Sequence, residues 1–533
     1  MLFKELKTNV SGRLCDNPHQ LKFLMRFVRF LLILMFGVGL AGVVAWTQPP
    51  LGFSPRSGGS LALVGGTVID VTDWGHSAKD LQDAVVVIRD GRVIEVGPRA
   101  EIFIPKGIRV IDCTGKYLIP GLVDGYAGMR NQGQASAFLF MGVTTVVARN
   151  DAEHGPIDFF AAPSPHIYAI DSIGTTDNWS LLGSISAGRQ GPHPGMRKAG
   201  QSGDPDWLVK LREGGHQTEL SPEDTARQLI DTAHMGTRVL WLGPRLTAVN
   251  AQWIIARAHQ MGLATYGEFL ATPYQVALEA GVDALPRMGR YEVGVVPEEL
   301  QRPLVDDRTG TAASTAYDYA ERLPVTDFHL RAYARQLAAR HAALMPIFSL
   351  YYLELPGHRN LWKEPAARLL DPASLTQPSN RTTGELSYSI SSWARHLPPA
   401  TQRWMEDSQR KKAQQSALRL WQINETIFAA YPHYLAASGA PVKGTMPGIS
   451  MHTELELLVR LGLSPREALA AATNNYALQF DWNELGLIAP GRRADILIID
   501  GDPTQNIWNA RRISTLIMDG NVIDREWLLN LRK

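Results

Sequence analysis

Two charged residues, Glu268 and Arg287, suggest chemistry most directly, because each stands near the end of a predicted β-strand. These strands, residues 263–269 and 283–288, would be neighbours in a parallel barrel, so their ends would meet at one mouth of it. A carboxylate and a guanidinium placed there can form an ion pair. The pair would act as a charge-balanced plug, or Arg287 would bind a carboxylate or phosphate ligand.

Other side chains could bind a ligand together with Arg287 or take part in a reaction. Tyr126 or Trp241 would stack on a ligand held by Arg287, and Glu268 or Asp124 would act as the acid or base of a metal-free reaction. Asp124 is more simply explained as a structural residue. On this basis the sequence assigns no catalytic residue.

The familiar catalytic and cofactor-binding motifs are missing from the sequence. No H-x-H, H-E-x-x-H or C-x-x-C is present, and no G-x-S-x-G, Walker or dinucleotide-binding loop occurs in a suitable context. The 14 histidines are scattered without the spacing of metal ligands, and His452 alone cannot hold an ion. We therefore predict no metal and no cofactor.

Strands and helices alternate along the central part of the chain. Helical patterns such as 222–235 and 251–261 separate short apolar runs, and Ser464 with Glu467 forms a capping box at the start of a later helix. This repeat predicts an α/β fold with a TIM-like (β/α)8 barrel at 117–482. The predicted strands are 122–127, 142–148, 166–171, 238–243, 263–269, 283–288, 344–350 and 441–446.

Strand-like segments at both chain ends bracket the barrel. Residues 61–116 contain a D-G hairpin turn at 89–92, and residues 483–533 return to short strands. The two ends together predict a β-sandwich. The polar stretch at about 357–413, broken by Pro and Gly, is interpreted as an insertion in the barrel.

The N-terminal region predicts a membrane anchor. Residues 30–46 carry no charge, and a helix of that length spans roughly 25 Å. Basic residues dominate the segment 1–29, which places it in the cytoplasm. We predict a single-pass signal anchor in the cytoplasmic membrane, a linker at 47–60 and an extracytoplasmic, periplasmic main domain. Cleavage of a signal peptide, and hence secretion, is the alternative.

The composition narrows the choice of partners. The net charge of +1 provides no field that favours nucleic acid. The two cysteines, Cys15 and Cys113, lie on opposite sides of the predicted membrane span, so a disulfide between them is not expected.

A long series of motifs follows the same order as in a known family. It comprises GKYLIPGLVD (115–124), MGVTTVV (141–147), ALEAGVDAL (277–285), GTMPGISMHTELELLVRLGLSPREALAAATNNYA (444–477) and GLIAPGRRADILIIDGDP (486–503). From about residue 61 to 525 the chain resembles the amidohydrolase superfamily, near its imidazolonepropionase-like and prolidase-like branches. The resemblance implies a TIM-like barrel, a β-sandwich from both chain ends, and divalent metal at the C-terminal ends of the barrel strands.

The resemblance also implies where the metal ligands would lie, and this sequence departs from the family at each position. The positions of the H-x-H pair, the carboxylated lysine, the two later histidines and the aspartate hold Tyr126 and Gly128, Trp241, Glu268 and Arg287, and Met446. Asp124 and His452 are possible neighbours. A divalent ion needs several converging N, O or S ligands, so a family-type metal site is not expected.

Three functions remain open. The first is a catalytically inactive amidohydrolase homologue that acts as a membrane-anchored binding, scaffold or regulatory protein, by analogy with the dihydropyrimidinase-like proteins. Its partner would be an active amidohydrolase paralogue, a membrane complex or a second copy of the chain. The second is a hydrolase of C–N bonds with an unrecognised or metal-free site. The third is a small-ligand receptor that uses the barrel mouth.

Overall fold

The computed structural model describes residues 59–148, 163–174, 220–234, 236–304, 311–388 and 392–530. The predicted cytoplasmic segment and membrane span, together with nearly all of the linker, lie outside these ranges. Within the described ranges no helix combines the length and the apolar character that a membrane crossing requires.

A curled parallel sheet of seven strands forms the centre of the described chain, and the strands pair in sequence order. Most of these strand residues are buried, as in β7, where all six residues are buried. Strands covered on both faces need apolar, β-branched sequences, which is why they were predictable. The strands are β6 (Leu122–Ala127), β7 (Val143–Ala148), β8 (His166–Ile173), β9 (Thr237–Leu242), β10 (Ala264–Gly267), β11 (Ala284–Pro286) and β12 (Ala343–Met345).

Residues 433–440 join the two edges of this sheet. On one side, Leu435 donates to the carbonyl of Leu344 in β12, and on the other, Gly439 donates to the carbonyl of Tyr126 in β6. The predicted eighth strand at 441–446 is therefore wrong, because those residues form turns and the segment before them takes the place beside β12. Met446 consequently does not end a barrel strand.

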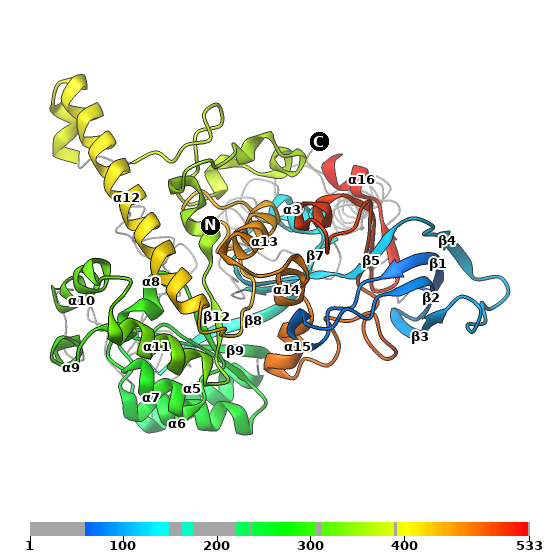
Figure 1. Cartoon of the computed structure of the whole chain (residues 1–533), viewed down its shortest axis with the longest axis horizontal. Coiled ribbons are helices and arrows are strands. Elements are labelled where there is room, and N and C mark those ends of the chain that lie inside the picture. The colour runs from blue at the N-terminus through cyan, green and yellow to red at the C-terminus, as the bar shows by residue number, and fades with distance from the viewer. Residues whose placement is uncertain are drawn as a thin grey trace, which may run out of the picture. The chain divides into compact units, whose positions relative to one another are not determined.

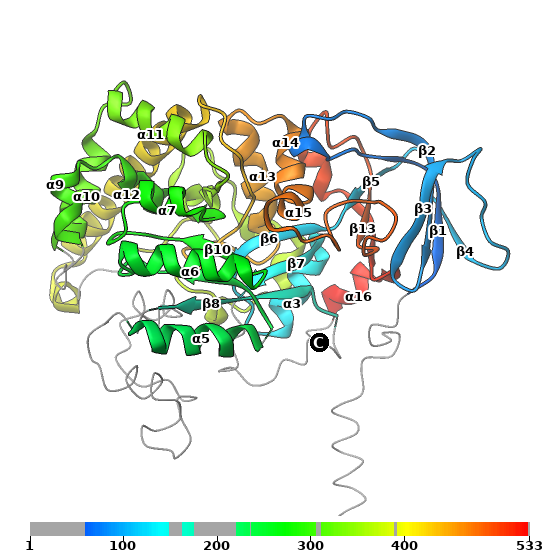
Figure 2. The same cartoon turned by 90° about the horizontal axis from the view of Figure 1, so that it is seen from below.

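Helices accompany the strands as the alternating pattern predicts. Helix α5 (Pro222–His234) lies against β8 and β9, and α6 (Ala248–Gln260) lies against β10 and beside α7 (Tyr274–Ala280) (Figure 2). The remaining α-helices of the barrel region are α3 (Gln132–Phe140), α8 (Met288–Tyr291), α9 (Glu298–Gln301), α10 (Thr311–Arg322), α11 (Phe328–Ala338), α12 (Pro399–Phe428), α13 (Ile449–Leu461), α14 (Pro465–Ala471) and α15 (Asn474–Phe480).

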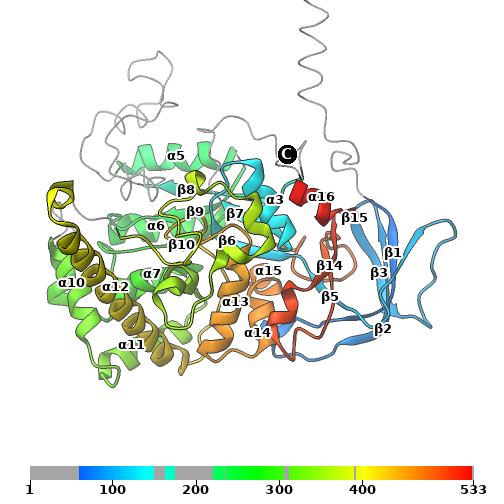
Figure 3. The same ribbon diagram turned by 90° about the horizontal axis from the view of Figure 1, so that it is seen from above.

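The predicted insertion contains short 3-10 helices and the beginning of α12. This long helix packs against α11 through its C-terminal half, where its buried residues lie (Figure 3). The insertion therefore ends in a regular helix, which the Pro- and Gly-broken sequence before it did not indicate.

Both chain ends form a second sheet, as predicted. Its hydrogen bonds join eight strands into one continuous sheet, and the N-terminal strands are blue in Figure 1. Strand β5 belongs to it, although residues 117–120 were assigned to the barrel. The strands are β1 (Leu61–Val68), β2 (Leu81–Arg89), β3 (Arg92–Pro98), β4 (Arg109–Asp112), β5 (Tyr117–Pro120), β13 (Ile496–Ile499), β14 (Ile513–Met518) and β15 (Asn521–Ile523), and α16 (Arg525–Asn530) follows.

Two local predictions from turn and cap chemistry are confirmed. Asp90 and Gly91 both have positive φ, as a two-residue hairpin turn between β2 and β3 requires. Ser464 and Glu467 form a reciprocal capping box at the start of α14. This helix ends at Ala471, and a separate helix, α15, begins at Asn474.

Candidate functional site

Four of the predicted positions meet at the C-terminal ends of the barrel strands. Tyr126 and Trp241 lie in the last two residues of β6 and β9, and Glu268 and Arg287 directly follow β10 and β11. Because the strands are parallel, these ends share one side of the sheet, the barrel mouth. This side carries the functional loops in barrels of this type.

Glu268 is the centre of a hydrogen-bonded cluster at this mouth. Its Oε1 accepts from the Tyr126 hydroxyl at 2.9 Å and from the Trp241 indole at 3.2 Å. Its Oε2 accepts from Arg287 Nη1 at 3.3 Å and lies 3.5 Å from Nε of Arg290. The residue is only 1% exposed, so two guanidinium groups and two neutral donors compensate a buried carboxylate.

The protonation of the donors suits this arrangement. Burial, followed by the charge of Glu268, raises the pKa of Tyr126 well above its usual range, so the phenol stays a donor. Burial opposes the charged form of Arg287, but Glu268 and Tyr126 together with Tyr351 outweigh it, so the pKa of Arg287 is raised. For Arg290, Tyr317 and Glu268 together overcome burial in the same way. All three groups therefore keep their protons at neutral pH.

The backbone of Arg287 is strained. Its φ of 67° and ψ of 105° place a long side chain in a region that favours glycine. The conformation is held by hydrogen bonds from its own N–H to Met345 and from Arg290 N–H to its carbonyl. Such strain costs about 1–3 kcal/mol and collects at functional sites.

Two other predicted positions lie apart from the Glu268 cluster. Gly128 follows β6, and its N–H donates to the carbonyl of Ala440 at 2.6 Å. Met446 is fully buried, and its N–H donates to the hydroxyl of Ser450 in the first turn of α13. Glycine has no side chain and that of Met446 is buried, so neither residue offers a side-chain ligand at the mouth.

Asp124 and His452 are buried, and each forms a hydrogen bond with the backbone of a distant segment. Asp124 Oδ1 accepts from the backbone N–H of Ser438 at 2.8 Å, which connects β6 to residues 433–440, the segment that joins the two sheet edges. Burial raises the pKa of Asp124 to about 6. His452 lies within α13 at 2.7 Å from the Met141 carbonyl, and burial lowers its pKa to about 3. The imidazole is therefore neutral at ordinary pH and hydrogen-bonded inside the fold.

Sequence reasoning missed several residues of the mouth. Arg290 stands three residues after Arg287 in the turn of α8, and Tyr317 of α10 contacts it. Lys443 binds Glu354 at 2.6 Å and lies 4.2 Å from the ring of Tyr351. The spacing of Arg287 and Arg290 was a usable signal, whereas the other contacts join distant segments.

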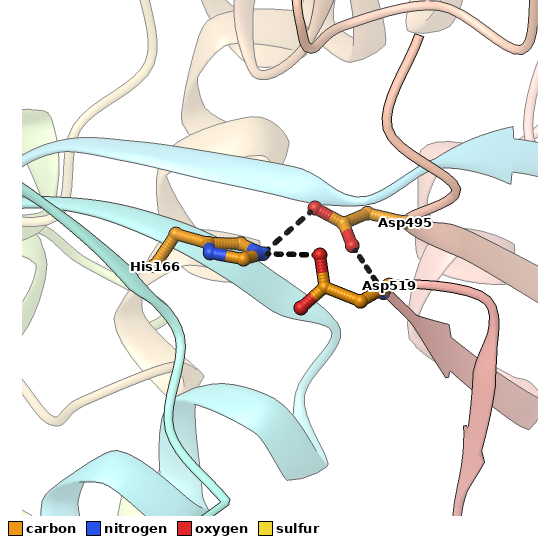
Figure 4. Close-up of side chains that lie close together, drawn as sticks. All are labelled: His166, Asp495 and Asp519. Carbon is orange, nitrogen blue, oxygen red and sulfur yellow. Dashed lines mark hydrogen bonds and ion pairs between the residues drawn. The ribbon is translucent and has the colours of Figure 1, made fainter. Parts of the chain in front are cut away.

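A second cluster lies at the start of β8, at the opposite end of the strand from the mouth. His166 Nε2 is 3.5 Å from Asp495 and 3.4 Å from Asp519, and the N–H of Asp519 donates to Asp495 (Figure 4). Arg493 Nε also binds Asp495, at 2.5 Å. We call these four residues the seam cluster, because they join β8 to the sheet of the chain ends. Sequence reasoning treated His166 as an ordinary residue.

Neither cluster offers a suitable set of metal ligands. Within the described residues, the seam cluster is the one group whose His and carboxylate atoms lie close enough to share an ion. The guanidinium of Arg493 binds the same carboxylate and would repel a cation. At the mouth, Glu268 is the one carboxylate of its cluster and is shared by two cations. The donor set of the mouth does not fit a divalent metal.

Comparisons with known proteins agree with the fold. Residues 436–523 match the Amidohydrolase family. Adenine deaminase of Paracoccus denitrificans (strain Pd 1222) is 28% identical over 156 residues, which are 27% of this chain and 24% of the deaminase. The chain thus spans about a quarter of that relative's length.

Solved structures extend the likeness over most of the chain. A putative prolidase from Bifidobacterium longum superimposes with a TM-score of 0.52 at 17% identity, covering 89% of this chain and 99% of the prolidase. A molinate hydrolase has a TM-score of 0.54 at 18% identity, covering 88% and 96%. The family domain and the shared fold support the predicted membership of the amidohydrolase superfamily.

Proposed function

We propose that this chain is an amidohydrolase-superfamily protein that does not hydrolyse through a bound metal and instead acts as a binding, scaffold or regulatory protein. One observation carries the proposal: four donors converge on Glu268, and two of them are guanidinium groups. The relatives are named as enzymes. Those names state the activity of the relatives and not the activity of this chain.

The cluster argues against metal-activated water for two reasons. A metal-bound hydroxide needs several N or O ligands with open lone pairs, and the carboxylate of Glu268 already accepts four contacts. A divalent ion beside Arg287 and Arg290 would also meet two fixed positive charges in a buried, poorly screened place. These groups balance the carboxylate without an ion.

The cellular setting of the proposal rests on the sequence. The uncharged segment 30–46 and its basic flank support an anchor in the cytoplasmic membrane, with the barrel outside the cytoplasm. An active amidohydrolase paralogue, a membrane complex or a second copy of the chain would be the partner. Membrane fractionation and protease accessibility in intact spheroplasts test this setting, and recovery of the intact chain from the soluble cytoplasm would contradict it.

The metal content of the detergent-purified full chain tests the main proposal. The protein is dialysed against zinc, manganese and iron, then against buffer, and is measured by mass spectrometry. We expect less than about one tenth of an equivalent of each metal, because no ligand set retains it. A metal-dependent hydrolase carried through the same dialysis is the control. One or two tightly held equivalents, with metal-dependent cleavage of an amide, would overturn the proposal.

A further inference from the structure

Arg287 has hydrogen-bonding capacity that the cluster does not use. A guanidinium group carries five N–H donors, and within the described part of the chain the one acceptor of this side chain is Glu268, at 3.3 Å. Glu268 is shared with three other donors. The Arg287 side chain remains 22% exposed. The remaining donors are therefore open to an acceptor that enters from outside.

The other cations of the mouth are already engaged. Lys443 forms a 2.6 Å ion pair with Glu354, whose other oxygen accepts from Tyr388. Arg290 contacts Glu268 and the hydroxyl of Tyr317. Arg287 is thus the cation of the mouth with donors to spare, and one such guanidinium matches one negative charge, with the fork geometry of a carboxylate.

Two aromatic side chains interact with this guanidinium, Tyr126 and Tyr351. Both are partly buried and pack against the barrel core, so part of each ring remains accessible. Tyr351 interacts electrostatically with Arg287, and its hydroxyl approaches the α8 turn at Gly289. Two partly exposed aromatic rings next to a charged anchor match the usual composition of a small-molecule site.

We propose that the barrel mouth binds a small monocarboxylate with an aromatic or apolar body, whose carboxylate pairs with Arg287 and whose body contacts Tyr126 and Tyr351. The inference rests on the proposed function, because it uses the mouth in its metal-free form. The strained backbone of Arg287 supports it, since the fold holds this side chain at the mouth against a local cost.

Binding of benzoate and benzamide to the EDTA-treated full chain tests the inference by calorimetry. The two probes share a ring and differ in charge, so the comparison isolates the carboxylate. We expect saturable benzoate binding and at least about tenfold weaker benzamide binding, because the amide lacks the charge and the second acceptor oxygen. Equal affinity for the two probes would overturn the inference. So would the absence of benzoate binding at benzoate concentrations up to about 100 μM, which is about 100 times a dissociation constant of 1 μM.

Arg287→Lys sharpens the test. Lysine keeps the positive charge opposite Glu268 but lacks the planar fork, so we expect benzoate to bind at least about tenfold more weakly. Arg322→Lys is the matched control, because Arg322 is 82% exposed on α10. The benzoate affinity of this variant should equal that of the natural chain. Unchanged binding by a folded Arg287→Lys variant would contradict the assignment. If that variant does not fold, the benzoate and benzamide comparison decides alone.

A chelator comparison separates the two proposals. Benzoate binding that is lost in EDTA and restored by zinc would show that the mouth holds a metal, and the proposed function would fail with the inference. A metal-free protein that binds no benzoate would overturn the inference and leave the proposed function standing.

Discussion

The two buried ion clusters lie at opposite ends of the barrel strands and have opposite balances of charge. The mouth has one carboxylate, Glu268, with two guanidinium groups and two neutral donors. The seam cluster has two carboxylates, Asp495 and Asp519, around one histidine and one arginine. Donors are in excess at the mouth, whereas acceptors are in excess at the seam.

This difference indicates different roles. In the seam cluster, the charged groups bind one another across two sheets, and the backbone N–H of Asp519 adds a further bond, so the cluster fixes the chain ends to β8. At the mouth, a strained and partly exposed Arg287 keeps donors in reserve. Barrels of this kind place stability at one end of the strands and ligands at the other.

The largest expected effect is that of Glu268→Ala. Removing the shared carboxylate leaves two guanidinium groups without their common partner in a buried site, so unfolding free energy should fall by about 3–5 kcal/mol. Urea denaturation measures this change. Glu298→Ala is the control, because its ion pair with Arg302 is exposed, and it should cost at most about 1 kcal/mol. A loss at Glu268 no larger than the control would mean that the cluster is not a buried plug.

Neutralising the central carboxylate of the seam cluster should lower the unfolding free energy almost as much as Glu268→Ala does. Asp495→Asn leaves Arg493 and His166 facing an uncharged amide, and we expect a loss of about 3 kcal/mol. Asp519→Asn is the matched change at the more exposed carboxylate, which lacks the Arg493 contact, and should cost about 1 kcal/mol. Equal losses from the two variants would show that Asp495 is not the centre of the cluster.

The two clusters should also differ in their response to pH. Burial alone would lower the pKa of His166, but Asp495 and Asp519 outweigh it and the pKa is raised. A histidine with a raised folded-state pKa adds stability that is complete below its unfolded pKa of about 6.5 and is lost as pH rises through the folded value. The stability difference between the natural chain and His166→Asn should therefore shrink as pH rises above about 6.5.

Chemical denaturation at a series of pH values measures this difference. Glu268→Ala is the control, because Glu268 contacts no histidine among the described residues. The difference in unfolding free energy between this variant and the natural chain should not change over the same pH range. A His166→Asn difference that grows with pH would show that the imidazole is held neutral in the folded protein.

The sequence predicted those parts of the fold that depend on local chemistry. The strands 122–127 and 142–148 were found because strands buried on both faces need continuous apolar residues. The strand predicted at 441–446 was wrong, and PVKGTM contains a Pro and a Gly, which strands disfavour. The segment beside β12 is instead the polar-ended YLAAS (434–438), and its place depends on contacts with Leu344 and Tyr126 that no local pattern records.

The candidate site, like the fold, was predictable only where it depends on local sequence. The pairing of Glu268 with Arg287 followed from two neighbouring strand ends, and the structure contains it. The contact between Tyr126 and Glu268 joins residues 142 positions apart and could not be read from spacing. His166, Asp495 and Asp519 come from three distant segments, so the seam cluster exists only after the two sheets have packed.

The smallest expected effect concerns the neutral donors of the mouth, and it tests how far charge alone explains the cluster. Tyr126→Phe removes one hydrogen bond to Glu268 and leaves both guanidinium groups in place, so we expect a loss of about 1 kcal/mol in urea denaturation. Tyr431→Phe is the control, because Tyr431 is highly exposed, and it should be near neutral. A loss as large as that of Glu268→Ala would mean that the phenol, and not the arginines, keeps the carboxylate in place. The excess of positive charge would then be the wrong description of the mouth, and the contrast with the seam cluster would fail.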